Sequence, residues 1–271
     1  MNRQPIILIM FLTFIVNFTF GQSGFTTTGG ANFLGYGRAG VNIAGIESIY
    51  LNQAGLTEVK NFSVDISAER RYNLSDLTNL SFAVAKSFKF GTIGLMVSNF
   101  GFTEYNEQKF GLAYARKLNK SISLGGQFDM LRYNVASIGS ISLFSFEAGM
   151  QLKLNRDFSL AAHVFSPGNL EVTENTDIGT RFRLGVKYAP SAKVFVLGEI
   201  DKLIDRKPEY KIGIGYQVID ILQIRFGINP TVSTYSFGAM LKFKDKYGIA
   251  TSMSLNEALG NSPAVSLQYQ Q

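Results

Sequence analysis

From residue 61 to the end of the chain, apolar and polar residues alternate with a period of two. This period places successive side chains on opposite faces of a β-strand. In residues 181–188, one face consists of Phe182, Leu184, Val186 and Tyr188, and the other of Arg181, Arg183, Gly185 and Lys187. The same pattern recurs at 210–218, 222–229 and 235–244. It predicts an all-β protein whose strands each carry one apolar face.

Turn signals divide this region into fourteen predicted strands. They cover residues 61–72, 78–88, 91–103, 108–118, 121–134, 140–154, 158–166, 180–189, 192–204, 208–219, 221–229, 234–244, 247–256 and 263–270. Most reach the length of about 9 to 11 residues that a tilted transmembrane strand needs. No segment after residue 60 has an unbroken apolar run long enough for a transmembrane helix, so only a closed barrel could cross a membrane.

The connections between these strands are alternately short and long. The short set is 89–92, 119–120, 155–157, 189–191, 219–220 and 244–246, and the longer set is 73–78, 104–108, 136–139, 166–179, 204–208, 229–233 and 257–263. Outer-membrane barrels have short periplasmic turns, whereas a soluble sandwich with Greek-key crossovers would not keep this alternation. We therefore predict a transmembrane antiparallel up-and-down β-barrel of about fourteen strands, integral in the bacterial outer membrane, with both termini periplasmic.

The first residues are typical of a secretory signal peptide. Arg3 precedes an apolar run at residues 6–20, which Gly21 and Gln22 follow. The run is shorter than the roughly 20 residues that a membrane-spanning helix needs. The predicted organisation is a signal peptide at 1–21, a Gly-rich segment without strand alternation at 22–60, and the barrel at 61–271.

Composition limits the possible chemistry. The chain has no Cys, which removes disulfides, thiolate metal sites, a Cys nucleophile and a lipidated Cys. Loss of Arg3 with the signal peptide lowers the net charge from +6 to +5. The basic residues are spread along the chain, so we predict no nucleic-acid partner. The expected partners are outer-membrane lipids and lipopolysaccharide.

Two motifs in the Gly-rich segment carry a family resemblance. Gly35-Tyr36-Gly37-Arg38-Ala39-Gly40 precedes Asn52-Gln53-Ala54-Gly55-Leu56. This order resembles the N-terminal signature of the PorV/PorQ and FadL-like outer-membrane barrels of Bacteroidota, although Gln53 stands where that family usually has Pro. The resemblance implies that residues 22–60 fold inward as a plug of the lumen. The implied plug-motif residues are Gly35, Gly37, Arg38, Ala39, Gly40, Asn52, Ala54, Gly55 and Leu56.

The strand faces independently indicate an occupied lumen. Residues opposite the aromatic face are often small: Gly111, Ala113, Gly185, Gly213, Gly215, Gly227 and Gly238. A barrel of about eight strands is just filled by its own side chains, so one of about fourteen strands is too wide for that. Its lumen must hold water, a ligand or a plug.

Basic residues also fall on the predicted lumen face: Lys109, Arg181, Arg183, Lys187, Lys211, Arg225, Lys242 and Lys244. One hypothesis is a cationic lumen that favours anions. The other, which we favour, is a structural set that binds plug carbonyls and carboxylates such as Glu47 and Glu58.

The motifs that suggest enzyme chemistry have simpler interpretations. Gly35-x-Gly37-x-x-Gly40 matches the dinucleotide-binding pattern, but no preceding strand or βαβ unit accompanies it. His163, the only histidine, is expected to be an ordinary strand residue. Glu171, Glu174 and Asp177 could bind a divalent ion, although a solvated acidic loop is the default. We predict no metal, no cofactor and no enzymatic activity.

The resemblance implies an accessory barrel that docks beside a larger outer-membrane complex for protein secretion or assembly, such as type IX secretion or the barrel-assembly machinery. The alternative is a FadL-like transporter that passes hydrophobic small molecules through a lateral opening in the wall. That alternative expects a kinked strand, for which Gly125-Gly126 and Ser166-Pro167-Gly168 are the candidates. A purely structural barrel is a third possibility.

Overall fold

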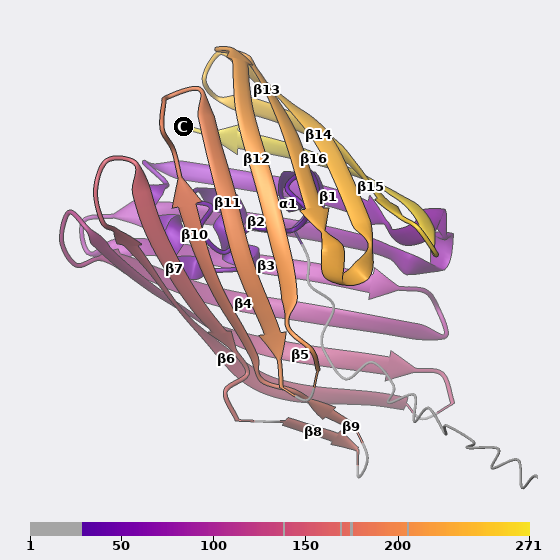
Figure 1. Ribbon diagram of the computed structural model, residues 1–271. Coiled ribbons are helices and arrows are strands. Elements are labelled where there is room, and N and C mark those ends of the chain that lie inside the picture. Colours follow the sequence, from indigo (N-terminus) through magenta and orange to yellow (C-terminus); the bar gives the residue numbers. More distant parts are fainter. Residues whose placement is uncertain (1–28, 138, 169, 174–175, 205) are drawn as a thin grey trace, which may run out of the picture.

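Fourteen antiparallel strands close into a barrel in the computed structural model, which describes residues 29–137, 139–168, 170–173, 176–204 and 206–271 (Figure 1). The order around the barrel is β1-β16-β15-β14-β13-β12-β11-β10-β7-β6-β5-β4-β3-β2. Strands β8 (Leu170–Thr173) and β9 (Thr176–Ile178) form a separate hairpin in the connection between β7 and β10. The predicted fold class, an antiparallel fourteen-stranded barrel, is confirmed. The predicted signal peptide lies outside the described residues.

Each predicted strand corresponds to one barrel strand, with ends that shift by a few residues. The barrel strands are β1 Phe62–Arg70, β2 Thr78–Phe88, β3 Gly91–Gly101, β4 Tyr105–Lys117, β5 Ile122–Val135, β6 Gly139–Lys153, β7 Phe158–Phe165, β10 Arg181–Tyr188, β11 Val194–Leu203, β12 Glu209–Ile219, β13 Leu222–Asn229, β14 Thr234–Phe243, β15 Tyr247–Asn256 and β16 Gly260–Gln270. The helical elements are α1 Gly30–Leu34 and the 3-10 turns η1 Ile46–Tyr50, η2 Gln53–Glu58, η3 Arg71–Asn73, η4 Ser75–Leu77 and η5 Pro230–Val232. None of the helices in the described ranges is long and apolar enough to cross a membrane.

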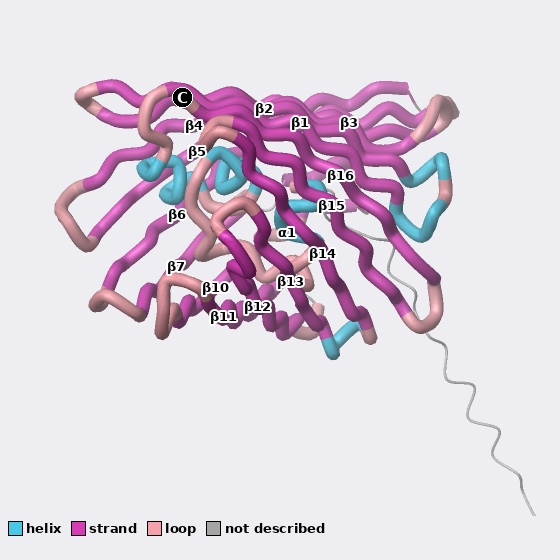
Figure 2. Tube along the Cα trace, turned by 90° about the horizontal axis from the view of Figure 1, so that it is seen from above, coloured by secondary structure: helices cyan, strands magenta, loops and turns pink. Residues whose placement is uncertain are grey.

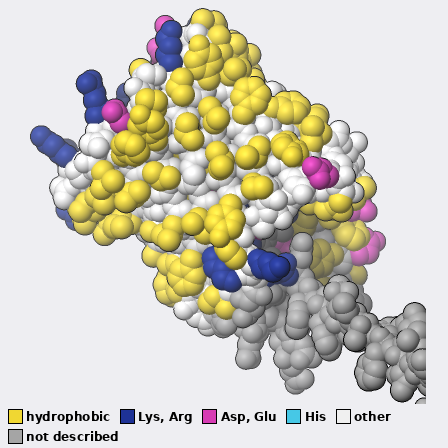
Figure 3. All heavy atoms as spheres, in the orientation of Figure 1, with side chains coloured by type: hydrophobic (Ala, Val, Ile, Leu, Met, Phe, Trp, Pro, Cys, Tyr) yellow, Lys and Arg dark blue, Asp and Glu magenta, His cyan; other side chains and the backbone are white. Residues whose placement is uncertain are grey.

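The apolar face of the strands points outward. Phe146, Leu184 and Phe226 are each more than half exposed, and hydrophobic side chains cover much of the outer face in Figure 3. Alternate residues, such as Arg183 between Phe182 and Leu184, are buried toward the lumen. A continuous apolar surface of this kind is unusual on a soluble monomer and fits contact with lipid.

The connections at the two rims of the barrel differ less in length than the sequence predicts. The short rim carries the β2–β3, β4–β5, β6–β7, β10–β11, β12–β13 and β14–β15 turns together with the start of β1 and the end of β16. On the long rim, residues 71–77 and 166–180 form the long connections, whereas 102–104 and 257–259 are tight turns. These turns are shorter than predicted because β4 and β16 each begin about three residues earlier and extend the ladder.

The height of the barrel wall also varies. Strands β4, β5 and β6 have 13, 14 and 15 residues, whereas β7 and β10 have 8 each. Pairing between β6 and β7 stops at Glu147 and Phe165, so residues 139–146 of β6 extend beyond the end of β7 toward the long rim. The wall is therefore lower at β7 and β10.

The prediction of a kinked strand at Gly125-Gly126 is wrong. Both residues pair in register with β4 and with β6, and the ladder is uninterrupted. A Cβ on Gly125 would lie 2.4 Å from the Ala54 backbone nitrogen, so this glycine provides room for another segment rather than a break. Ser166-Pro167-Gly168 follows the last residue of β7 and begins the connection to β8.

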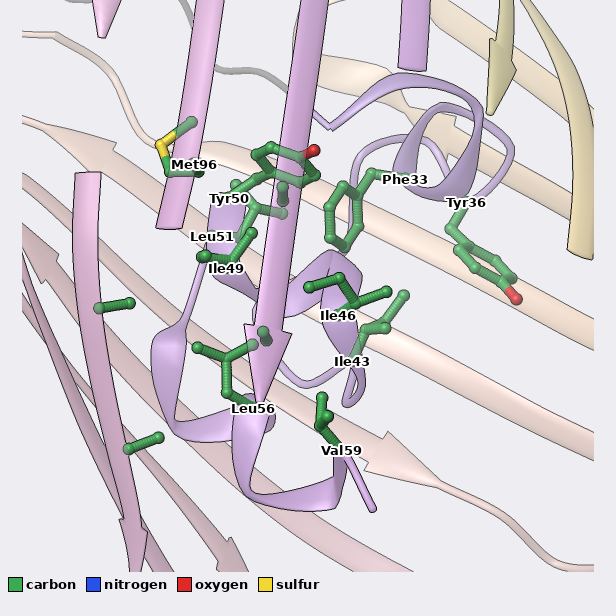
Figure 4. Packing of buried hydrophobic residues seen from close by; sticks show 14 of the residues in the cluster. Phe33, Tyr36, Ile43, Ile46, Ile49, Tyr50, Leu51, Leu56, Val59 and Met96 are labelled. Atoms are coloured by element: carbon green, nitrogen blue, oxygen red, sulfur yellow. The ribbon is translucent and has the colours of Figure 1, made fainter. Parts of the chain in front are cut away.

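Residues 29–60, which we call the inner segment, lie inside the barrel between its opposite walls (Figure 2). Its apolar side chains, among them Ile49, Tyr50 and Leu56, pack on Met96 and on small residues of β2 and β4 (Figure 4). The small wall residues are Ala83, Ala85, Ala113 and Ala115. The main core of the protein thus lies between the inner segment and one wall of the barrel.

The outward orientation of Leu184 gives a stability prediction. This side chain is 58% exposed near the middle of β10. Leu184→Arg is expected to destabilise the barrel in a bilayer by about 2–4 kcal/mol, because a lipid-facing guanidinium is costly there. Urea unfolding in lipid vesicles measures the loss, and lumen-facing Ser236→Arg is the control. Equal effects of the two substitutions would contradict the assigned faces.

Candidate functional site

The first motif of the inner segment packs against β12 and β13. Gly37 and Arg38 have φ angles of 63° and 64°, which turn the chain sharply after α1. A Cβ on Gly227 would lie 2.0 Å from the Gly37 nitrogen, so the two backbones touch without side chains between them. The Gly-x-Gly-x-x-Gly pattern therefore serves close packing inside the barrel.

Carboxylates of the wall hold this motif in place. Glu199 of β11 accepts hydrogen bonds from the backbone amides of Gly40 and Val41, each at 2.8 Å. Half-buried Arg38 forms an ion pair with Glu69 of β1. The remaining members of the motif, Gly35, Gly37, Ala39 and Gly40, are buried.

The second motif is fixed to β5, β6 and β7. The Asn52 side chain accepts from the Ala54 amide at 3.2 Å and donates to the Val41 carbonyl at 2.9 Å and the Met150 carbonyl at 3.2 Å. The Gln53 side chain donates a hydrogen bond to Glu147 Oε2 at 2.9 Å, which a proline in this position could not donate. The other members, Ala54, Gly55 and Leu56, are fully buried.

A belt of charged side chains runs around the lumen wall from β4 to β12. Its members are Lys109, Asp129, Glu147, His163, Arg181, Arg183, Glu199, Asp201 and Lys211. Lys109 pairs with Glu147 and with Asp129, the latter at 3.4 Å. Lys211 pairs with Asp201 at 2.7 Å and with Glu199 at 3.2 Å. The belt reaches the inner segment through Glu147 and Glu199.

His163 joins the two halves of the belt. One ring nitrogen lies 2.8 Å from Glu147 Oε2, and the other lies 3.2 Å from the guanidinium of Arg183. Arg183 in turn contacts Asp201 at 3.3 Å. His163 lies on β7, where the sequence predicts a strand residue, but the alternation alone did not reveal its two charged partners.

Seven of the eight predicted lumen-basic residues face the lumen. Arg225 binds a carbonyl of the inner segment, that of Asn32, as expected, whereas other members have different partners. Lys109, Arg181, Arg183 and Lys211 pair with carboxylates of neighbouring strands rather than with Glu47 or Glu58. The remaining three are Lys187, Arg225 and Lys242, which line a cavity near the short rim. Lys187 lies over the Phe195 ring at 4.5 Å. Lys244 is exposed in the β14–β15 turn.

The two acidic residues of the inner segment have other partners. Glu58 pairs with Lys117 at 2.9 Å and Lys153 at 3.0 Å, at the short rim. The hydrogen bond from Lys117 is the largest influence that lowers the pKa of Glu58 below its usual value. Glu47 accepts a hydrogen bond from Gln268 at 3.3 Å, and burial raises the pKa of its carboxyl.

The described ranges contain no group of three or more His, Cys, Asp or Glu side chains that could hold a metal ion. This finding does not cover the predicted acidic loop with Glu171, Glu174 and Asp177. Glu174 lies outside the described residues, and the side chains of Glu171 and Asp177 are likewise not described.

Two cavities lie in the lumen along β13–β16, one on each side of the inner segment. The long-rim cavity has a volume of about 430 Å³, and Phe33, Leu34 and Leu51 of the inner segment contribute to its lining. The short-rim cavity has a volume of about 290 Å³, and Tyr36 and Ile43 contribute to its lining. The inner segment separates them.

The Gln53–Glu147 hydrogen bond gives a second prediction. Gln53→Glu would place a second carboxylate against Glu147, and we expect a loss of roughly 1–3 kcal/mol in unfolding free energy. Denaturant unfolding in detergent micelles measures it. Gln53→Ala, which only removes the donor, should cost less, and wild-type stability of Gln53→Glu would refute the assigned contact.

Glu58 gives a prediction that depends on pH. A carboxyl whose pKa is lowered on folding stabilises the protein above its unfolded pKa, and this stabilisation is lost as the pH falls through the folded pKa. Glu58→Gln should therefore lower the unfolding temperature at pH 7. The corresponding loss of unfolding free energy is expected to be less than about 1 kcal/mol, because the Glu58 side chain is partly exposed. The difference from wild type should shrink in acid. A difference that is constant from pH 7 to pH 3 would contradict the ion pairs.

Comparison with known proteins identifies the fold. No family model and no curated protein sequence matches the chain. Among solved structures, the CymD monoaromatic hydrocarbon channel matches with a TM-score of 0.68 at 12% identity, over 92% of this chain and 99% of CymD. The toluene transporter TodX of Pseudomonas putida gives 0.66 at 11%, over 92% and 98%. A FadL homologue of Pseudomonas aeruginosa gives 0.66 at 11%, over 90% and 99%.

At these identities the likeness establishes the fold alone. It agrees with the FadL-like part of the sequence resemblance, whereas the nearer relation to PorV and PorQ and an origin in Bacteroidota stay predictions. CymD and TodX are named as a channel and a transporter, not as enzymes. The chain thus has the fold of the FadL-type outer-membrane β-barrels, which supports a location in the outer membrane.

Proposed function

We propose that the protein is an outer-membrane channel for small hydrophobic molecules, plugged by its inner segment. The observation that carries this proposal is a lumen that contains one cavity toward each rim, with the inner segment between them. CymD and TodX, which share the fold, are named for monoaromatic hydrocarbons and toluene. In this proposal the long rim faces the exterior and the short rim, with both termini of the barrel, faces the periplasm.

The long-rim cavity has an apolar surface on which such a molecule could collect. Phe33, Leu34 and Leu51 supply it from the inner segment, and Leu203, Val232 and Leu259 supply it from the barrel. Apolar contact of this kind gains about 25 cal/mol for each Å² removed from water. Passage to the short-rim cavity requires a shift of the inner segment, which is held by hydrogen bonds and ion pairs that can break and reform.

The fold neighbours favour transport over the accessory role that the sequence resemblance suggests. A docking role beside a larger secretion or assembly complex remains a separate prediction. Affinity purification in mild detergent tests it, since recovery without a stoichiometric outer-membrane partner would count against it.

Uptake of radiolabelled toluene by cells that express the protein tests the channel proposal. Wild type is expected to raise the uptake rate several-fold over cells with empty vector. Leu259→Asp, which places a charge at the long-rim cavity, should reduce this gain, whereas Leu118→Asp in a short-rim turn should not. Both leucines are 57% exposed, so the two substitutions are matched. Uptake equal to empty vector for toluene and for other hydrophobic probes would overturn the proposal.

A further inference from the structure

Arg225 is a deeply buried cation that forms no ion pair with any carboxylate of the described residues. Its guanidinium contacts the carbonyl and side-chain oxygens of Asn32, each at 3.3 Å, and the Gln223 side chain at 3.1 Å, all of them neutral. Only 3% of the residue is exposed. Within the described part of the chain, no Asp or Glu oxygen comes within ion-pair distance of it, although the comparably buried Lys109 and Lys211 have two such partners each.

A buried charge without an opposite charge is costly, and a bound anion would offset that cost. Arg225 lines the short-rim cavity, so a small anion in that cavity could reach it. The cavity also presents cations at Lys187, Lys242 and Lys246.

The acidic groups of the short-rim cavity compensate these cations only in part. They are Glu47, Glu58 and Asp245. Glu58 is engaged by Lys117 and Lys153, which do not belong to the cavity lining. Burial raises the pKa of Glu47, and the charge of Arg225 acts in the opposite direction. The cavity therefore retains an excess of positive charge.

Basic residues also outnumber acidic ones in the lining of the long-rim cavity, where Arg38, Arg71 and Lys211 pair with Glu69 and Glu199 outside that lining. Its basic lining residues are Arg38, Arg71, Arg181, Arg206, Lys207 and Lys211, and its acidic ones are Asp201 and Glu209. On β14–β16 the long-rim cavity is lined by hydroxyl and amide side chains, namely Thr234, Ser236, Ser254, Asn256 and Ser262. Between the two cavities, Ser252 and Ser266 form hydrogen bonds with the Ala31 backbone. Water and small ions are compatible with such a surface, in contrast to the alanine-rich wall at β2 and β4.

Next to β13, the part of the inner segment that separates the two cavities is only about one residue thick. Consecutive residues of the inner segment line opposite cavities, with Gly37 in the long-rim cavity and Tyr36 in the short-rim cavity. The Tyr36 hydroxyl donates to Gln223 at 2.7 Å, and its ring lies 4.9 Å from the Arg225 guanidinium. Asn32, Tyr36 and Arg225 together close the lumen at this point.

From these observations we infer that the lumen contains a second, polar path for small hydrophilic anions along β13–β16, in which Arg225 binds the anion and closes the path together with Tyr36. The path uses the same two cavities as the proposed route of hydrophobic molecules, but it depends on the polar and basic side chains of their linings rather than on the apolar ones. An anion that neutralises Arg225 competes with the Asn32 carbonyl for the guanidinium, and this competition loosens the closure.

Single-channel recording in planar bilayers, with gradients of potassium chloride and then potassium phosphate, tests the inference. Wild type should give small, brief openings whose reversal potential shows anion selectivity. Tyr36→Ala, which leaves the barrel wall intact, should raise the mean conductance several-fold and keep that selectivity. Arg225→Gln should lose most of the selectivity, whereas Arg116→Gln, an exposed arginine at the end of β4, should match wild type.

Heat-modifiable migration on unboiled gels shows whether each variant has folded. Folded Tyr36→Ala and Arg225→Gln proteins with wild-type conductance and reversal potential would overturn the inference, and so would a cation-selective wild type. Toluene uptake separates this result from the proposed function. Wild-type uptake by Arg225→Gln would support two routes that depend on different side chains, whereas anion current without any toluene uptake would leave the anion path standing and remove the hydrophobic one.

Discussion

The structure depends on one geometric constraint, which is that a closed barrel of fourteen strands is wider than its own side chains can fill. A bilayer demands closure, because an open sheet edge would leave backbone groups without hydrogen bonds in lipid. The consequence is a lumen that needs other contents. The inner segment supplies part of them, and the charged belt on the wall makes the remaining space polar.

The lumen is filled asymmetrically. On one side, alanines of β2 and β4 allow Ile49 and Leu56 of the inner segment to pack closely against the wall. On the other side, hydroxyl and charged groups of β13–β16 leave two cavities. Between these cavities α1 packs on Met240, Ala250 and Ala264, so passage from one cavity to the other requires a shift of α1. Glu147 and Glu199 link the belt to the segment, so the charges of the wall also position it.

The barrel was predictable from sequence because period-two alternation specifies both the strands and their outward faces. Residues such as Arg183 and Lys211 were placed in the lumen for the same reason. Their partners were not predictable, since pairing across strands depends on register, which alternation does not give. Asp129, Glu147, Glu199 and Asp201 also occupy alternating inward positions, and this signal could have suggested the belt. The prediction of a kink at Gly125-Gly126 was wrong because a glycine that makes room for another backbone cannot be distinguished in the sequence from one that interrupts a strand.

The inner segment, residues 29–60, is held inside the lumen at a fixed position by its contacts with the barrel wall. Because the chain has no Cys, spin labels can be attached to Ala44→Cys in the inner segment and Lys120→Cys in a short-rim turn, both at exposed positions. Pulsed electron-spin distance measurement on the double variant in lipid nanodiscs is the most direct test. A segment that is held in place should give one narrow distance distribution. A broad distribution that extends beyond the dimensions of the barrel would contradict it.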